Sequence, residues 1–194
     1  MAEPGYQSLP ASITDLVASG QCFWYKTALG GVAAAAVGVN SAPFIWNPSG
    51  SGVRLRILKV KFGIVSGAGA LQHLAYGLLS AAGAQIGTAQ PIVSYTPGAA
   101  VNANVNKGLP SVMNFCPLTT TMTAGPAYLM PAGLSTIGAL AAGVPVKLVD
   151  DVNGEIIINP GDAFFPLIAG GTITLTLAVA VLGWEEVIPS GGAR

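Results

Sequence analysis

The most constraining stretch of this sequence lies between residues 172 and 181, where small or hydroxylated side chains alternate with large apolar ones. The small set is Thr172, Thr174, Thr176, Ala178 and Ala180, and the large set is Ile173, Leu175, Leu177, Val179 and Val181. A period of two is the period of a β-strand, whose successive side chains point to opposite faces of its sheet. The sequence therefore predicts a long strand whose large apolar face is core.

The same stretch bears on the question of a membrane, because the mean hydropathy of the chain is +0.62. Residues 166 to 184 carry no charge, and their length approaches the roughly 20 residues of a spanning helix. The alternation indicates a strand instead, and the Ala-rich run 29–39 is too short to span. We therefore predict no membrane partner.

Turn-forming residues divide the chain into short segments. Asn-Pro-Ser-Gly at 47–50 follows an apolar run, and Asn-Pro-Gly-Asp at 159–162 precedes a predicted strand at 163–169. Asn153 and Gly154 lie between the apolar segments 146–149 and 155–158. Since Asn-Gly supplies the two positive-φ positions of a tight turn, we predict that these two segments pair as a hairpin.

The segment 53–62 contains a shift of its alternation by one residue. Its polar positions are Arg54 and Arg56, and then Lys59 and Lys61. An extra residue in the strand, a β-bulge at Ile57-Leu58, keeps the same face buried through such a shift. A strand that crosses from one sheet to another produces the same pattern, so both interpretations stay open.

Many short strands, frequent turns and almost no helix predict an all-β fold, with a jelly-roll-like β-sandwich as the leading topology. At 194 residues the chain is long enough for one domain with its own core. We expect an extended N-terminal arm over residues 1–20, with a short helix after Ser12, one sandwich domain over 21–188 and a C-terminal tail over 189–194. Residues 70–79 fit a strand or a helix, and residues 80–109 fit long Ala/Gly-rich loops or short edge strands.

Charge is scarce in this chain. Charged residues make up 8% of it and the net charge is zero, whereas roughly 25% is usual. Between Phe62 and Pro145 the sole formal charge is Lys107. A stretch of that length cannot all be core, so part of its uncharged surface is expected to be an interface in an assembly. Too few cations are present to follow a phosphate backbone, so no nucleic acid is expected as a partner. The four basic residues clustered at 54–61 are interpreted as a solvated or interface face.

No group of residues has the spacing of a catalytic or metal site. His73 is the sole histidine and no serine lies in a nucleophile-elbow motif, so a catalytic triad is not predicted. Asp151, Asn153 and Glu155 alternate like calcium ligands, and Asp150 adds another carboxylate, but the set misses the EF-hand spacing. Glu185 and Glu186 are neighbours in a strand and should point to opposite faces. We therefore predict no enzyme, no catalytic, cofactor-binding or metal-binding residue, and no cofactor.

Aromatic residues and cysteines are further candidate functional residues. The aromatic set is Trp24, Trp46, Trp184, Tyr25, Tyr76, Tyr95 and Tyr128. Such side chains stack on sugars, but at this wide spacing core or interface anchors are the simpler interpretation.

The first twenty residues contain no Lys or Arg, so no secretory signal is predicted. Cys22 and Cys116 are accordingly expected to be buried thiols rather than a disulfide.

Two segments resemble parts of small virion structural proteins of tailed bacteriophages. The first is Phe-Ile-Trp-Asn-Pro-Ser-Gly-Ser-Gly-Val at 44–53, followed by alternating basic and aliphatic residues. The second is Asn-Pro-Gly-Asp-Ala at 159–163, followed by the Thr/Ala-rich strand and by Gly-Trp-Glu-Glu-Val at 183–187. The resemblance implies a β-sandwich module that assembles as a trimer on heads, tails or fibres and has no enzymatic activity.

The resemblance and the low charge together lead to one functional expectation. The chain is expected to be a capsid decoration or cement protein, made in the host cytoplasm and incorporated into the virion. It would stabilise the shell through contacts with itself, as a homotrimer, and with the major capsid protein or other virion subunits. The alternative is a fibre or spike head module that binds host-surface carbohydrate.

Overall fold

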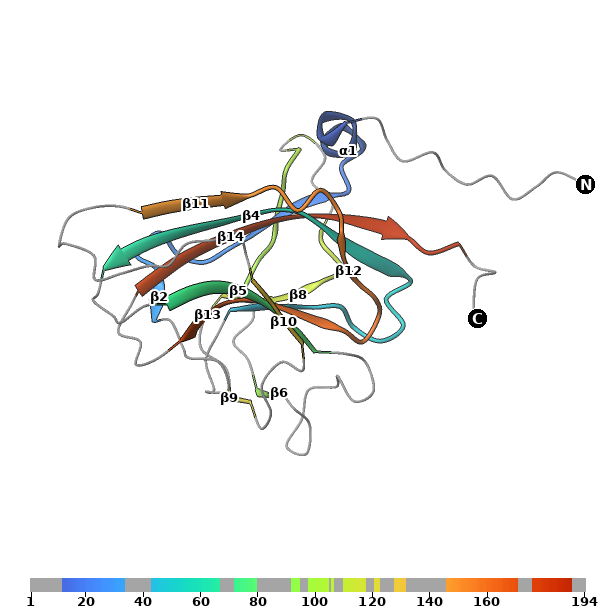
Figure 1. Ribbon diagram of the computed structural model, residues 1–194. Coiled ribbons are helices and arrows are strands. Elements are labelled where there is room, and N and C mark those ends of the chain that lie inside the picture. The colour runs from blue at the N-terminus through green and yellow to red at the C-terminus, as the bar shows by residue number, and fades with distance from the viewer. Residues whose placement is uncertain are drawn as a thin grey trace, which may run out of the picture.

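The computed structural model describes residues 12–33, 43–66, 72–79, 92–94, 98–104, 106, 110–117, 121–122, 128–131, 146–170 and 176–189. In this part of the chain, one short helix accompanies two antiparallel sheets that lie face to face (Figure 1). The predicted all-β class is confirmed, whereas the jelly-roll connectivity stays a prediction. Within the same residues, the structure contains no helix with the length and hydropathy needed to cross a membrane.

The larger sheet, sheet A, is built around two long strands. Its order is β11 (Val146–Asp150), β4 (Val53–Ser66), β14 (Thr176–Val187), β1 (Cys22–Lys26) and β7 (Val101–Asn102). Two further strands extend it, because β12 (Ile156–Ile158) pairs with β4 and β2 (Val32–Ala33) pairs with β14. The two central strands, β4 and β14, are therefore more than a hundred residues apart in the sequence, and their pairing extends to Val53 opposite Val187.

The second sheet, sheet B, lies on the opposite side of the core. Its order is β10 (Tyr128–Pro131), β5 (Gln72–Leu79), β13 (Ala163–Gly170), β3 (Phe44–Trp46) and β8 (Asn114–Cys116). The segment 70–79 is thus a strand where the structure describes it. A separate pair, β6 (Ile92–Ser94) with β9 (Thr121–Met122), lies on the side of sheet B remote from sheet A (Figure 1).

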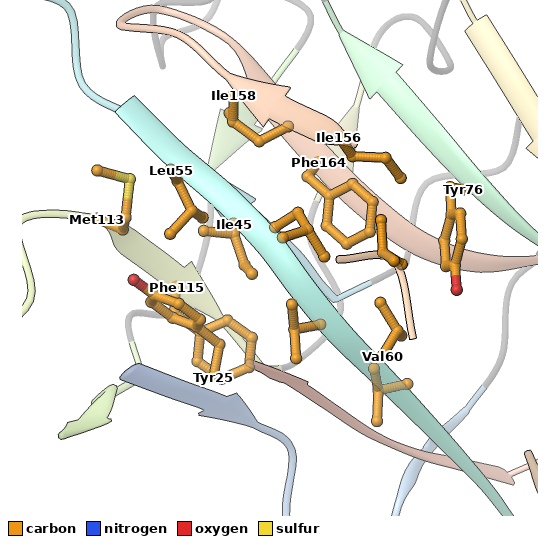
Figure 2. Close-up of a cluster of buried hydrophobic side chains, with 14 of the residues drawn as sticks. Tyr25, Ile45, Leu55, Val60, Tyr76, Met113, Phe115, Ile156, Ile158 and Phe164 are labelled. Atoms are coloured by element: carbon orange, nitrogen blue, oxygen red, sulfur yellow. The ribbon is translucent and has the colours of Figure 1, made fainter. Parts of the chain in front are cut away.

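The core lies between the sheets and follows the predicted alternation of β14. Leu177, Val179 and Val181 are 2%, 4% and 1% exposed and pack in the main apolar cluster. The intervening residues of β14 are half-buried on the other face, so the predicted face is confirmed from residue 176 onward. Residues 171–175, with the rest of the predicted alternation, lie outside the described residues. Figure 2 shows side chains from both sheets meeting in this cluster.

The register shift in β4 is a β-bulge, as one of the two interpretations predicted. Leu182 of β14 pairs with Lys59 and Gly183 pairs with Ile57, so Leu58 is the extra residue. The strand continues in sheet A on both sides of the shift, and the sheet-crossing interpretation is therefore wrong. Leu58 is 4% exposed and belongs to a second apolar cluster, with Leu16 of the helix among its members.

The predicted hairpin at Asn153 and Gly154 is wrong, although the backbone of these two residues is as expected. Their φ angles are 53° and 84°. However, β11 and β12 both pair with β4 and lie in succession along its edge. The amides of Asn153 and Gly154 donate to the carbonyls of Leu58 and Ile57, at 2.9 and 2.8 Å. The turn therefore accommodates the bulge of β4 instead of reversing the chain.

Asn47 joins the two predicted turns that pass between the sheets. Its side-chain amide donates to the carbonyls of Val53 and Ile158, at 2.9 and 3.0 Å. Its backbone carbonyl accepts from the amide of Gly161 at 2.7 Å. The turns at 47–50 and 159–162 are thus confirmed, and a fully buried amide side chain holds them together.

The helix α1 (Ile13–Ser19) covers part of the outer face of sheet A, the face away from sheet B (Figure 1). The Ser12 hydroxyl accepts from the amide of Asp15 at 3.2 Å, which is the N-cap predicted from the sequence. Leu16 is the helix residue buried against the sheet. Residues 1–11 and 190–194, which include most of the expected arm and tail, lie outside the described residues.

Candidate functional site

The predicted basic cluster lies on the outer face of sheet A. The inward positions of β4 are taken by core residues such as Leu55 and Phe62, so the four cations point to the other face. The Nε atoms of Arg54 and Arg56 lie 2.5 and 2.7 Å from Oε2 of Glu186. The Lys59 ammonium lies 2.7 Å from Oδ1 of Asp151. Three of the four cations therefore have a carboxylate partner.

Glu186 is the centre of this ion-pair group. The hydrogen bond from Arg54 is the main cause that lowers the pKa of Glu186, and Arg56 contributes in the same direction while burial opposes them. The same interaction raises the pKa of Arg54. Since one carboxylate partners two guanidinium groups, the arginines are held in place and partly neutralised, which disfavours a free anion-binding role for them.

Two tryptophans also lie on this face. The Lys61 ammonium lies 4.5 Å from the ring centroid of Trp24, and the Arg56 guanidinium lies 6.0 Å from that of Trp184. Both arrangements have the geometry of a cation–π contact. Trp184 is 7% exposed and packs in the cluster beneath α1, with Trp24 at its border.

The remaining aromatic candidates do not form an open platform where the structure describes their side chains. Tyr25 and Tyr76 are 0% and 3% exposed in the core, and Trp46 is half-buried. Tyr128 pairs with Leu78 through the backbone of β10, and Tyr95 lies outside the described residues. These positions fit core anchors better than a sugar-stacking surface.

A buried carboxylate that the sequence analysis did not place in the core lies on the inner face of β14. Glu185 is 5% exposed. Its Oε1 accepts from the Tyr25 hydroxyl at 2.9 Å and also from the Ser111 hydroxyl. The amide of Val112 lies 3.1 Å from both carboxylate oxygens. We call Glu185, Tyr25, Ser111 and Val112 the Glu185 clamp.

The Glu185 clamp joins the segment 111–113 to the end of sheet A. Burial, and then the nearby Glu185 charge, raise the pKa of Tyr25 well above its ordinary value, so this hydroxyl stays a hydrogen-bond donor. The carboxylate accepts from three donors and faces the interior, which suits a structural anchor better than an acid that acts on substrate. Glu186 points to the outer face, so the predicted divergence of the two glutamates is confirmed.

The two acidic residues at the end of β11, Asp150 and Asp151, also diverge. Oδ2 of Asp150 accepts from the Tyr76 hydroxyl of sheet B at 2.6 Å, whereas Asp151 pairs with Lys59 on the outer face. The side-chain amide of Asn153 donates to the backbone carbonyl of Asp151 at 3.1 Å. Among the described residues there is no cluster of three or more His, Cys, Asp or Glu side chains able to hold a metal ion.

The other candidates of the sequence analysis are a histidine and two cysteines. His73 lies in β5 opposite Ala169, and its side chain is outside the described part. Cys22 and Cys116 are buried and form no disulfide, as predicted. Burial raises the pKa of Cys22 to about 12, so its thiol is a poor nucleophile in the folded protein.

Comparisons with known proteins match no family model, no curated protein and no solved structure. Functional conclusions therefore depend on the residues of the chain and their geometry.

Proposed function

We propose that this protein is a non-enzymatic structural component of a virion, a decoration or cement protein that stabilises the capsid through contacts between subunits. The observation that carries the proposal is the single formal charge, Lys107, between Phe62 and Pro145. A soluble monomer ordinarily spreads charge over its whole surface, and a subunit embedded in an assembly does not need to. The resemblance of the segments 44–53 and 159–187 to virion proteins supports the same proposal.

Exposed apolar side chains give this proposal further support. Those that are large and solvent-exposed in the described part are Leu29, Val65, Val101, Val112, Val149 and Val187. Single exposed side chains of this kind are ordinary on a monomer. In a chain with so few charges, however, such side chains suit contact with neighbouring subunits. A homotrimer is the proposed self-assembly, and the major capsid protein or another virion subunit is the proposed partner.

The test compares virions with and without this chain. Particles that lack it should release their genome at lower temperature, and adding the purified protein should restore the original release temperature. Because the protein would bind the assembled shell, its affinity for free coat subunits should be much weaker. Stripped particles that are equally robust but no longer adsorb to host cells would replace this proposal with the carbohydrate-binding fibre or spike module.

The oligomeric state gives an independent check. Light scattering of the purified chain at micromolar concentration should report a trimer. A monodisperse particle of 19.4 kDa, stable without detergent, would contradict the proposed self-assembly.

A further inference from the structure

In the described part of the chain, α1 covers only part of the outer face of sheet A, and the other part carries lysines among small residues. In one row across the sheet, Lys26 pairs with Ala180, which pairs with Lys61. In the next row, Ala178 pairs with Gly63, which pairs with Lys147. We call these residues, Lys26, Ala180, Lys61, Ala178, Gly63 and Lys147, the lysine face.

Two lysines of the lysine face, Lys26 and Lys61, have no carboxylate partner among the described residues. The outer-face carboxylates Glu186 and Asp151 are already paired with Arg54, Arg56 and Lys59. No ion pair joins a carboxylate of the described residues to Lys26 or Lys61. Lys147 is placed on this face by the backbone register of β11 alone. In a chain of zero net charge, three of its five lysines are therefore on one small area.

Gly63 is a second, independent feature of this face. It lies in a regularly paired stretch of a central strand and does not have a positive φ. A Cβ added there would meet the Cβ of Ala178 at 3.8 Å, an ordinary contact. Gly183 differs, since its added Cβ would lie 2.5 Å from Leu55. Among the described residues, neither conformation nor packing requires glycine at position 63, where it weakens a strand, and close approach of a ligand or of another backbone is a common reason for glycine inside a strand.

We propose that the lysine face binds an acidic polypeptide segment of a partner protein. The segment lies across β14 and β4, so that its backbone approaches Gly63 and its carboxylates reach Lys26 and Lys61. Trp24 holds the Lys61 ammonium at 4.5 Å, which orders this donor before binding. The inference goes beyond the proposed virion role and holds for any partner protein with such a segment.

A polypeptide fits this face better than a nucleic acid does. Affinity for a phosphate backbone comes from many cations that follow the strand, and each contact adds to the salt dependence. The lysine face offers three cations around residues with short side chains, glycine and alanine. Because these side chains are short, a second main chain can come near the sheet, and complementary charge then fixes its position.

The first experiment uses lysines labelled by reductive ¹³C-methylation, which preserves their charge. The chain has five lysines, so each gives an assignable signal. Poly-L-glutamate is the probe, with duplex DNA at equal charge as the comparison. We expect poly-L-glutamate to shift the signals of Lys26, Lys61 and Lys147 and to leave Lys59 and Lys107 in place. Equal shifts at all five lysines, no binding, or tighter binding of DNA through the same lysines would overturn the proposal.

The second experiment separates binding from folding. The charge reversal Lys26→Glu with Lys61→Glu should weaken poly-L-glutamate binding about tenfold or more, because each change replaces an attraction with a repulsion. Lys107→Glu is the charge-matched control, and if the lysine face alone carries the binding this change alters affinity less than about twofold. Gly63→Val should leave the melting temperature unchanged or raised, because valine favours strands, while it weakens binding. Unchanged affinity in a folded Gly63→Val protein would refute the close approach at this position.

Discussion

Removing the carboxylate of Glu185 should strongly destabilise the fold. In the folded protein this side chain is 5% exposed and accepts from the Tyr25 hydroxyl at 2.9 Å and from the Val112 amide at 3.1 Å. The Ser111 hydroxyl is a third donor. Glu185→Ala leaves these donors without their acceptor and opens space beside them. A buried donor left without its acceptor costs about 1–3 kcal/mol, and because three donors lose their acceptor here we expect a total loss of about 3–5 kcal/mol.

Two milder substitutions should give a graded series. Glu185→Gln preserves the volume and one carbonyl oxygen, but it places an NH₂ group among donors, so a loss of about 1–3 kcal/mol is expected. Tyr25→Phe removes a single donor and should cost about 1–2 kcal/mol. Glu155→Ala is the matched control, because this carboxylate is exposed and its removal should change stability by less than about 0.5 kcal/mol.

Urea denaturation followed by tryptophan fluorescence measures the series, with the free energy of unfolding obtained by linear extrapolation. Hydrogen exchange at the amides of Val112 and Met113 gives a local readout, since these residues lose their anchor in Glu185→Ala. Exchange there should accelerate by more than the global loss of stability explains. If Glu185→Ala costs no more than Glu155→Ala, the Glu185 clamp does not contribute to stability and the reasoning is wrong.

Three further predictions concern packing, pH and thiol chemistry. Gly183→Ala should cost about 1–3 kcal/mol, because its Cβ would lie 2.5 Å from Leu55; an unchanged melting temperature would contradict this. The hydrogen bond from Arg54 lowers the pKa of Glu186 in the folded state. The stability that Glu186 contributes is therefore fully present above its ordinary pKa of 4.5, and it is lost as the pH falls through the lower pKa of the folded state. Below pH 4.5, the stability of Glu186→Gln should therefore fall less steeply with pH than that of the wild type, as measured by acid unfolding followed by circular dichroism. Identical curves for the two proteins would argue against this role of Glu186. The Cys22 thiol, whose pKa burial raises to about 12, should react with an aromatic disulfide reagent only after unfolding, and rapid native labelling would disprove its burial.

Features that depend on a local pattern were predictable from the sequence. The alternation at Leu177, Val179 and Val181 identified the buried face of β14, because side-chain direction has a period of two in any strand. The polar positions of β4 indicated either a bulge or a crossing between sheets, and the structure has the bulge, at Leu58. Ser12 likewise identified the start of α1, since an N-cap bonds within its own turn.

Features that depend on distant partners were not predictable in the same way. Asn153 and Gly154 have the predicted backbone, but the carbonyls they bond to belong to β4, almost a hundred residues earlier. Tyr25, a partner of Glu185, is 160 positions away. The alternation of β14 does assign position 185 to the inner face once the strand is extended past Gly183. Nothing local shows which donors meet the carboxylate there.

The central place of β14 in sheet A has a consequence for how the chain folds during synthesis. β1 and β4 emerge from the ribosome early, yet each pairs with β14, which is translated more than a hundred residues after β4 begins. Until residues 176–187 emerge, two hydrogen-bonding edges and much of the inner apolar surface have no partner. The nascent chain is thus exposed to aggregation over most of its translation, and closure of the sheet awaits one late strand.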